Sequence, residues 1–299
     1  MSAIEIPSVP QGPEPASEPA LVLRAEGRPA SRWYRQPALM AGIVILAVVV
    51  GLALAAPLIT SYNPIAQNLN ESLLGPSAHH LLGTDQLGRD TFTRLLYGLR
   101  LDLRIAFLAV LFPFVLGTVL GLLAGYFGGW ADTVIMRIVD IVVAFPFYVL
   151  IIALVFVLGP GERSIYVAIT AVGWVAYARI IRGEILVAKR QDYVTAARSG
   201  GLSNLRIMRR HLLPNVITQA FIYGMSDIVQ DILAIVTLGF FGLGIPPPTA
   251  DLGSMINDGQ NFLSTHWQLA TVPGLAVVLV GLGLSLVGDG LADLLRPGQ

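Results

Sequence analysis

The sequence predicts an all-α polytopic membrane protein. Of its 299 residues, 55% are hydrophobic and 13% are charged, whereas soluble domains carry about 25% charged residues. Six apolar runs are long enough to cross a bilayer as helices; they cover residues 38–60, 104–126, 134–158, 164–183, 216–241 and 270–288. The runs are continuous rather than alternating, which favours helices over a transmembrane β-barrel. We therefore expect six transmembrane helices.

The chain begins with a segment of different composition. Residues 1–37 are rich in Pro, Ser, Glu and Ala and show no apolar period, which is typical of disordered segments. The run at 38–60 is expected to be a retained helix, because the apolar core of a signal peptide lies nearer to the start and precedes a small-residue cleavage site. We thus expect a disordered cytoplasmic tail over 1–37, then a first transmembrane helix and an external loop over 38–103.

Basic residues indicate the orientation, because cytoplasmic loops hold an excess of Arg and Lys. Four arginines precede the first span, and the segment between spans four and five carries Lys189, Arg190, Arg198, Arg206, Arg209 and Arg210. An even number of spans separates the two regions, so both are predicted to be cytoplasmic, as are the N- and C-termini. The external loop is an exception to the rule, since it carries Arg89, Arg94 and Arg100.

The residues of common catalytic and nucleotide-binding motifs are missing. There is no cysteine, which excludes thiolate metal sites and cysteine nucleophiles. The only lysine, Lys189, follows Ala188, so there is no GxxxxGK[ST] loop to hold the phosphates of ATP. The HExxH motif of zinc proteases and the GxSxG motif of serine hydrolases are also absent,. We predict a protein that is not an enzyme and that binds no metal and no cofactor.

A polar and basic segment over 191–213 separates two apolar runs. Its first half is predicted to be a short helix that ends at Gly200 and Gly201, because glycine tolerates left-handed backbone angles. Ser203 is a candidate cap for a second helix, which Pro214 is expected to end.

The second helix is predicted to be amphipathic and to lie outside the bilayer. Leu205, Met208 and Leu212 follow helical spacing and form an apolar stripe, while Ala196 and Ala197 in the first helix allow close approach of another backbone. Small residues beside a short apolar stripe suit insertion into a groove on a partner protein. The alternative is a basic loop that only fixes the orientation or rests on lipid headgroups.

Residues 195–214 resemble the EAA signature of permease subunits of ABC importers. The matching positions are Ala196, Ala197, Gly201, Leu213 and Pro214, whereas Thr195 and His211 replace the glutamate and the isoleucine of the signature. Four further stretches resemble C-type permease subunits of the dipeptide, oligopeptide and nickel group; they are LLGTDQLGRDTFTRLLYGLRLDL at 81–103, GYFGGWADTVIMRIVDIVVAFP at 125–146, LGFFGLGIPPPT at 238–249 and GDGLADLLRP at 288–297. The chain departs from that group at Ile235 and Leu252, where relatives often carry glutamate and tryptophan.

The resemblance implies a type I ABC importer permease, with a five-helix core over 104–299, an accessory N-terminal span and coupling helices over 191–213. It implies as partners a B-type permease subunit, two ATP-binding cassette subunits or one fused ATPase, and an extracytoplasmic substrate-binding protein. The ATPases would bind ATP and Mg, and the assembly would lie in a bacterial cytoplasmic (inner) membrane. The residues implied in coupling to the ATPases are Ala196, Ala197, Gly201, Leu205, Met208, Leu212 and Pro214.

The implied cargo is a di- or oligopeptide. Nickel chelates and glutathione-like solutes are alternatives within the same family. An ion-coupled secondary transporter is the rival class, and it would have no use for a helix that docks on a partner.

Two acids mark the fifth span. Asp227 and Asp231 lie within an apolar run, where a charge costs about 2.5–3.5 kcal/mol on insertion scales. We expect them to face a water-filled path or a partner rather than lipid, with Gln230 beside them. Phe145 and Phe147 in the third span are further path candidates, since Pro146 between them is expected to loosen the helix locally.

A stripe of small residues runs along the second span. Gly117, Gly121 and Gly125 recur every four residues, so they share one helical face. We expect this face to pack closely against another helix.

Overall fold

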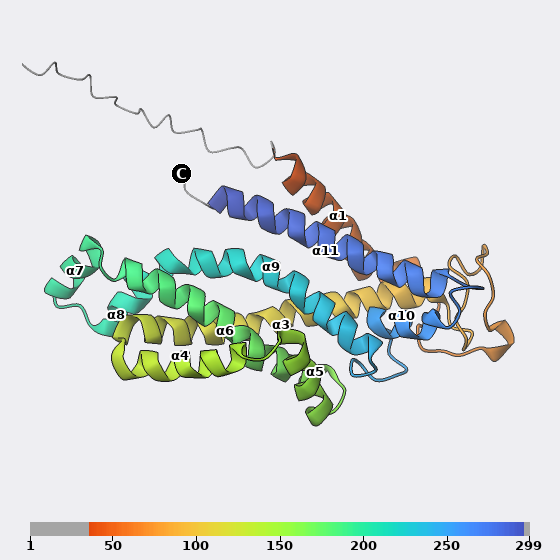
Figure 1. The fold of residues 1–299 in the computed structure, drawn as a ribbon. Helices are drawn as coiled ribbons and strands as arrows, with labels where there is room; N and C mark the ends of the chain where they lie inside the picture. The colour runs from red at the N-terminus through yellow and green to blue at the C-terminus, as the bar shows by residue number, and fades with distance from the viewer. Residues whose placement is uncertain (1–35, 296–299) are drawn as a thin grey trace, which may run out of the picture.

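The computed structural model describes residues 36–295, which fold into a set of helices (Figure 1). They are α1 (Pro37–Leu54), α2 (Ala56–Ile59), the 3-10 turn η2 (Leu69–Glu71), α3 (Thr91–Phe127), α4 (Gly129–Val143), α5 (Phe147–Leu158), α6 (Glu162–Ala188), α7 (Asp192–Ser199), α8 (Asn204–Ile207), the π-helical turn η3 (Met208–Leu212), α9 (Leu213–Phe240), α10 (Leu252–Gln260) and α11 (Gln268–Leu295). Among these described residues, five helices are long and apolar enough to cross a membrane, and a bent pair can provide a sixth span. The prediction of an all-helical membrane protein is confirmed; the tail expected over 1–37 lies outside the described residues up to residue 35.

α3 is longer than the apolar run that predicted it. It begins at Thr91 because the Asp90 carboxylate caps it, accepting a hydrogen bond of 2.7 Å from the N–H of Thr93,. Its 37 residues span about 55 Å, whereas the hydrocarbon core of a bilayer is about 30 Å thick. The first turns of α3 therefore belong to the segment that is predicted to be external.

The third predicted span is not one straight helix. It is divided into α4 and α5, which are bent by 90° relative to each other across a short break. Pro146 is the cause, because proline has no N–H to donate and disfavours helical backbone at the residue before it. The expectation that this proline only loosens the helix is wrong: Phe145 and Phe147 flank a sharp corner.

The glycine stripe of α3 packs against α6 as predicted. A Cβ atom at Gly121 would lie 2.6 Å from the carbonyl oxygen of Ala178, and one at Gly125 would lie 2.8 Å from Cβ of Ile185. Gly117 also faces the backbone of α6. These distances leave no room for a methyl group, so the glycines set the close approach of the two helices.

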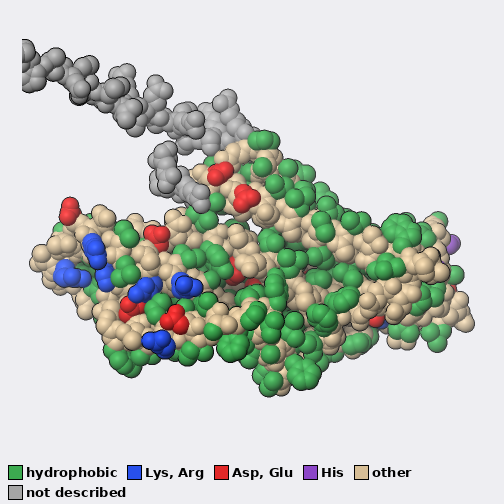
Figure 2. All heavy atoms as spheres, in the orientation of Figure 1, with side chains coloured by type: hydrophobic (Ala, Val, Ile, Leu, Met, Phe, Trp, Pro, Cys, Tyr) green, Lys and Arg blue, Asp and Glu red, His purple; other side chains and the backbone are tan. Residues whose placement is uncertain are grey.

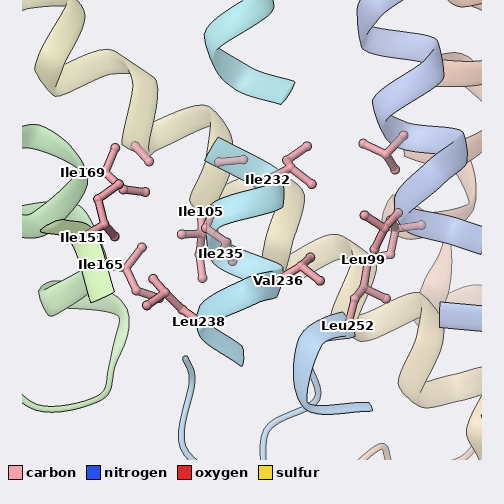
Figure 3. Packing of buried hydrophobic residues seen from close by; sticks show 14 of the residues in the cluster. Leu99, Ile105, Ile151, Ile165, Ile169, Ile232, Ile235, Val236, Leu238 and Leu252 are labelled. Atoms are coloured by element: carbon pink, nitrogen blue, oxygen red, sulfur yellow. The ribbon is translucent and has the colours of Figure 1, made fainter. Parts of the chain in front are cut away.

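The main hydrophobic core lies where α3, α5, α6, α9 and α10 meet (Figure 3). Its buried members include Leu99, Ile105, Ile151, Ile165, Ile169, Ile232, Ile235, Val236, Leu238 and Leu252. α1 packs along α11 (Figure 1). The close packing of these side chains fixes α9 against α3 and α6. α9 is the helix that carries Asp227 and Asp231.

Buried ion pairs fix the segment before α3, which is predicted to be external. Nε of Arg89 and Nε of Arg94 lie 2.6 Å and 3.4 Å from Oδ2 of Asp85. Arg94 also donates hydrogen bonds of 3.1 Å and 3.4 Å to the carbonyl groups of Pro64 and Pro248, which joins this segment to the loop after α9. Two of the three arginines that depart from the rule on loop charge are thus paired inside the protein.

Candidate functional site

The loop between α6 and α9 projects at one end of the molecule, where α7 and α8 lie (Figure 1). α7 ends at the glycine pair, as predicted. Gly201 has φ of +76°, its N–H donates to the carbonyl of Arg198 at 3.0 Å, and the N–H of Leu202 donates to the carbonyl of Ala197 at 3.2 Å. These bonds form a Schellman motif, which places a left-handed residue just after the helix. Leu202 and Ala197 pack against the same buried cluster, the apolar contact that accompanies this motif,.

The second half of the loop differs from the prediction. The helix that begins at Asn204 does not end at Pro214 but continues through η3 into α9. In η3 the N–H of Leu213 bonds to the carbonyl of Met208, five residues earlier. This π-helical turn shifts the hydrogen-bond ladder just before the proline, which has no N–H to contribute. The second half of the loop, from Asn204, and the span are therefore one continuous helix.

The three residues of the predicted apolar stripe differ in their exposure. Met208 and Leu212 are 5% and 0% exposed and pack in the chain's own core with Val194 of α7, whereas Leu205 is 60% exposed. The prediction of a continuous stripe that faces a partner is therefore wrong. Met208 and Leu212 instead fix α7 to the beginning of α9.

The outward surface of the loop is small and basic. Ala196 and Gly201 are exposed and Ala197 is half-buried. Leu205 and Pro214 line an open hollow of about 560 Å³ together with Ser203, Arg206, Arg209 and Arg210. Figure 2 shows Lys and Arg side chains gathered at this end, whereas hydrophobic side chains cover the middle of the molecule.

Hydrogen bonds and apolar contacts hold the loop on three spans. The hydroxyl of Tyr126 on α3 donates to Oδ1 of Asn204 at 2.8 Å, and Nζ of Lys189 donates to the carbonyl of Gly125 at 2.7 Å. The buried cluster under the loop also contains Ile181, Ile185 and Val216. Since packed side chains transmit displacement, a displacement of α7 would be transmitted to α3, α6 and α9.

A second hollow lies at the corner between α4 and α5. Its volume is about 300 Å³, and its lining includes Phe145 and Phe147 from the corner, Tyr223 and Gln230 from α9, and Arg179 from α6. Three of the predicted path residues thus come together. Tyr223 and Arg179 were missed, although a cation inside an apolar run is a sequence signal for a functional residue.

The two acids of α9 do not line this hollow. Asp227 and Asp231 are 3% and 1% exposed, so neither faces lipid. Asp227 accepts a hydrogen bond from Tyr177, while Oδ2 of Asp231 has no hydrogen-bond partner among the residues that the structure describes. Their place on a transport path stays a prediction.

Comparison with known proteins identifies the family. A family described as "Binding-protein-dependent transport system inner membrane component" matches residues 117–299, more than half of the chain. The chain belongs to this family. A second match, "N-terminal TM domain of oligopeptide transport permease C", covers residues 30–76, so the first span of this transport-system component also has relatives.

Individual members of the family are similar over most of the chain. The dipeptide transport system permease protein DppC of Bacillus subtilis is 39% identical over 259 residues, which cover 86% of this chain and 81% of the relative. The glutathione transport system permease protein GsiD of Pectobacterium atrosepticum is 38% identical, with 89% of each chain covered. This component is therefore a membrane-embedded subunit of an ABC transporter.

A solved structure shares the fold. The MetNI methionine ABC transporter, in inward-facing conformations, matches with a TM-score of 0.52 and 19% identity, covering 68% of this chain and 97% of that chain. At this identity the likeness concerns the arrangement of helices alone. It agrees with the fold predicted from the sequence.

Proposed function

We propose that the chain is the C-type permease subunit of an ATP-driven importer of di- or oligopeptides. Similarity to a dipeptide permease at 39% identity over 86% of the chain supports the cargo. Similarity to a glutathione transport system permease supports glutathione-like solutes as an alternative cargo of the same kind of importer. Nickel chelates are a further alternative cargo.

The observation that carries the coupling role is the rigid attachment of the exposed loop to the spans. Ala196, Gly201 and Leu205 are exposed, while Val194, Met208 and Leu212 anchor the same loop in the core. A partner that presses on the exposed residues would therefore move α9 with α7 as one body. An ion-coupled secondary transporter, the rival class, has no use for such an element.

The proposed transport path uses the hollow at the corner of α4 and α5. Phe145, Phe147 and Gln230 line it, and a B-type permease subunit would supply the facing half. A largely apolar lining with a few polar groups, here Gln230, Tyr223 and Arg179, suits peptides of varied sequence,. Asp227 and Asp231 would bias the path electrostatically from the core of the chain.

The remaining parts of the importer are proposed to reside in partner subunits. Two ATP-binding cassette subunits, or one fused ATPase, would bind ATP and Mg, and this chain would bind no cofactor and catalyse no reaction. An extracytoplasmic binding protein would deliver the cargo. The chain would lie in the bacterial cytoplasmic (inner) membrane with both termini in the cytoplasm.

Crosslinking tests this assignment directly, because the natural chain has no cysteine. Ala196→Cys carries a photo-crosslinker on the exposed face of α7, and Ser264→Cys is the matched control on the exposed loop before α11. In the assembled complex we expect Ala196→Cys to crosslink to the ATPase and Ser264→Cys not to do so. Absence of an ATPase adduct from Ala196→Cys in a complex that transports cargo would overturn the coupling role.

A further inference from the structure

Arg100 is an external cation that the ion pairs of the external segment leave unexplained. Arg89 and Arg94 are 4% and 3% exposed and both pair with Asp85. Arg100 is exposed, and within residues 36–295 no acidic side chain pairs with it. Its guanidinium is therefore available to bind an anionic group.

Two hollows meet at Arg100 and its neighbour on the next turn, Arg104. One hollow, of about 490 Å³, lies between α1, α3 and α11 and is lined otherwise by apolar side chains such as Val50, Phe107 and Leu284. The other, of about 310 Å³, lies toward the external loops and is lined by residues that include Tyr97. Both contain the two arginines, so an apolar space and a more polar space share one cationic boundary.

The position of this boundary matches the edge of the bilayer. Arg104 begins the apolar run at 104–126, and the residues before it belong to the external segment. Arg100 and Arg104 are four residues apart, so they lie on one face of α3 with side chains close to each other. Nη2 of Arg104 lies 2.8 Å from Oε2 of Glu162, which leaves Arg100 as the cation without a counter-charge.

We propose that this pair of hollows binds one anionic phospholipid. An acyl chain would occupy the apolar hollow between α1 and α3, and the phosphate would accept hydrogen bonds from Arg100 and Arg104. Guanidinium groups recognise phosphate oxygens through paired donors, and basic pockets between transmembrane helices bind lipid headgroups. The lipid would hold α1 on the core, because residues of both α1 and α3 line the apolar hollow.

Lipid retention tests the proposal without reference to the transported solute. The full chain, purified with its partner subunits, is reloaded with phosphatidylglycerol or with phosphatidylcholine, and bound lipid is counted by native mass spectrometry. We expect the wild type to retain phosphatidylglycerol in preference to phosphatidylcholine. Arg100→Gln should lower this preference about fivefold, the effect of one arginine near a charged headgroup.

Two further variants separate the headgroup from the acyl chain. Arg163→Gln removes an exposed arginine near the start of α6 that lines neither hollow, and should leave retention unchanged. Val50→Trp fills the apolar hollow at constant charge and should reduce retention of both lipids. Glycerophosphate without acyl chains should not displace the bound lipid.

Several results would overturn the proposal. No lipid retained by the wild type, or equal retention of the two lipids, would do so. Equal lipid retention by the Arg100→Gln and Arg163→Gln variants would also overturn it. So would a crosslink from a residue of the apolar hollow to a helix of the B-type subunit, since that helix would then occupy the space. Size-exclusion profiles of all variants check that each is folded.

Discussion

The hydroxyl of Tyr177 on α6 donates a hydrogen bond of 2.7 Å to Oδ2 of Asp227 on α9, and both side chains are buried. A charged or neutral carboxyl in the membrane needs such a partner, because no water is available there. The bond therefore joins two spans at the point where α9 carries its acids. It also explains how Asp227 can be buried inside this chain.

Replacing Tyr177 with phenylalanine should destabilise the protein. Tyr177→Phe keeps the ring but removes this donor to Asp227, and the loss of a hydrogen-bond partner costs about 1–3 kcal/mol for a buried polar group. Thermal unfolding of the detergent-purified protein measures the loss. Tyr193→Phe is the control, since Tyr193 is 40% exposed, and it should change stability by less than about 0.5 kcal/mol; equal unfolding curves for the two variants would show that the bond contributes nothing.

A bulky residue in the glycine stripe should separate α3 from α6. Gly121→Leu places atoms where a Cβ already lies 2.6 Å from a carbonyl oxygen of α6, so we expect a loss of about 3 kcal/mol or more from overpacking. Gly183→Leu is the matched control, because nothing lies within 4 Å of a Cβ there. Yields and melting temperatures after membrane extraction distinguish the two, and a Gly121→Leu protein as stable as Gly183→Leu would contradict the packing.

The left-handed turn after α7 should be needed for coupling. Gly201→Leu forces a side chain into φ of +76°, which costs about 1–2 kcal/mol and should reduce ATP-dependent uptake by about tenfold. Membrane insertion should be unaffected, because a Cβ at Gly201 meets no neighbour within 4 Å. Gly200→Leu is the control, since Gly200 has φ of −74°; uptake by Gly201→Leu at the level of this control would refute the role of the turn.

The external segment should depend on Arg94. Arg94→Gln removes one of the two cations that pair with Asp85 and the donor to two carbonyl groups. Because Asp85 keeps Arg89, we expect a loss smaller than about 3–5 kcal/mol, the cost when a buried charge loses its only partner. Arg94→Lys should rescue only part of this, because one ammonium cannot reproduce the geometry of a guanidinium. Limited proteolysis of residues 61–90 measures the loosening. The exposed Arg163→Gln should resist protease like the wild type, and the same resistance in Arg94→Gln would rule out the clamp.

Hydrophobic pattern and small residues predicted the features that depend on local sequence. The positions of the spans along the chain follow from the apolar runs. The close contact between α3 and α6 follows from Gly117, Gly121 and Gly125, because a helical face without side chains lets another helix approach closely. Gly201 likewise predicted the end of α7, since a Schellman motif needs a left-handed residue.

Features that depend on tertiary packing escaped the sequence. Pro214 reads as a helix stop, but a π-helical turn carries the chain past it. Met208 and Leu212 read as a surface stripe, although Val194 and the spans cover them. Arg94 reads as a charged loop residue, and its partner at Pro248 lies 154 positions away. No local pattern reports such contacts.

The most direct test of the proposed importer is uptake of a labelled dipeptide into proteoliposomes that contain this chain, its B-type partner, the ATPase subunits and the loaded binding protein. We predict uptake that requires ATP and stops when the ATPases are omitted. Uptake by this chain alone, driven by an ion gradient, would contradict the proposed function.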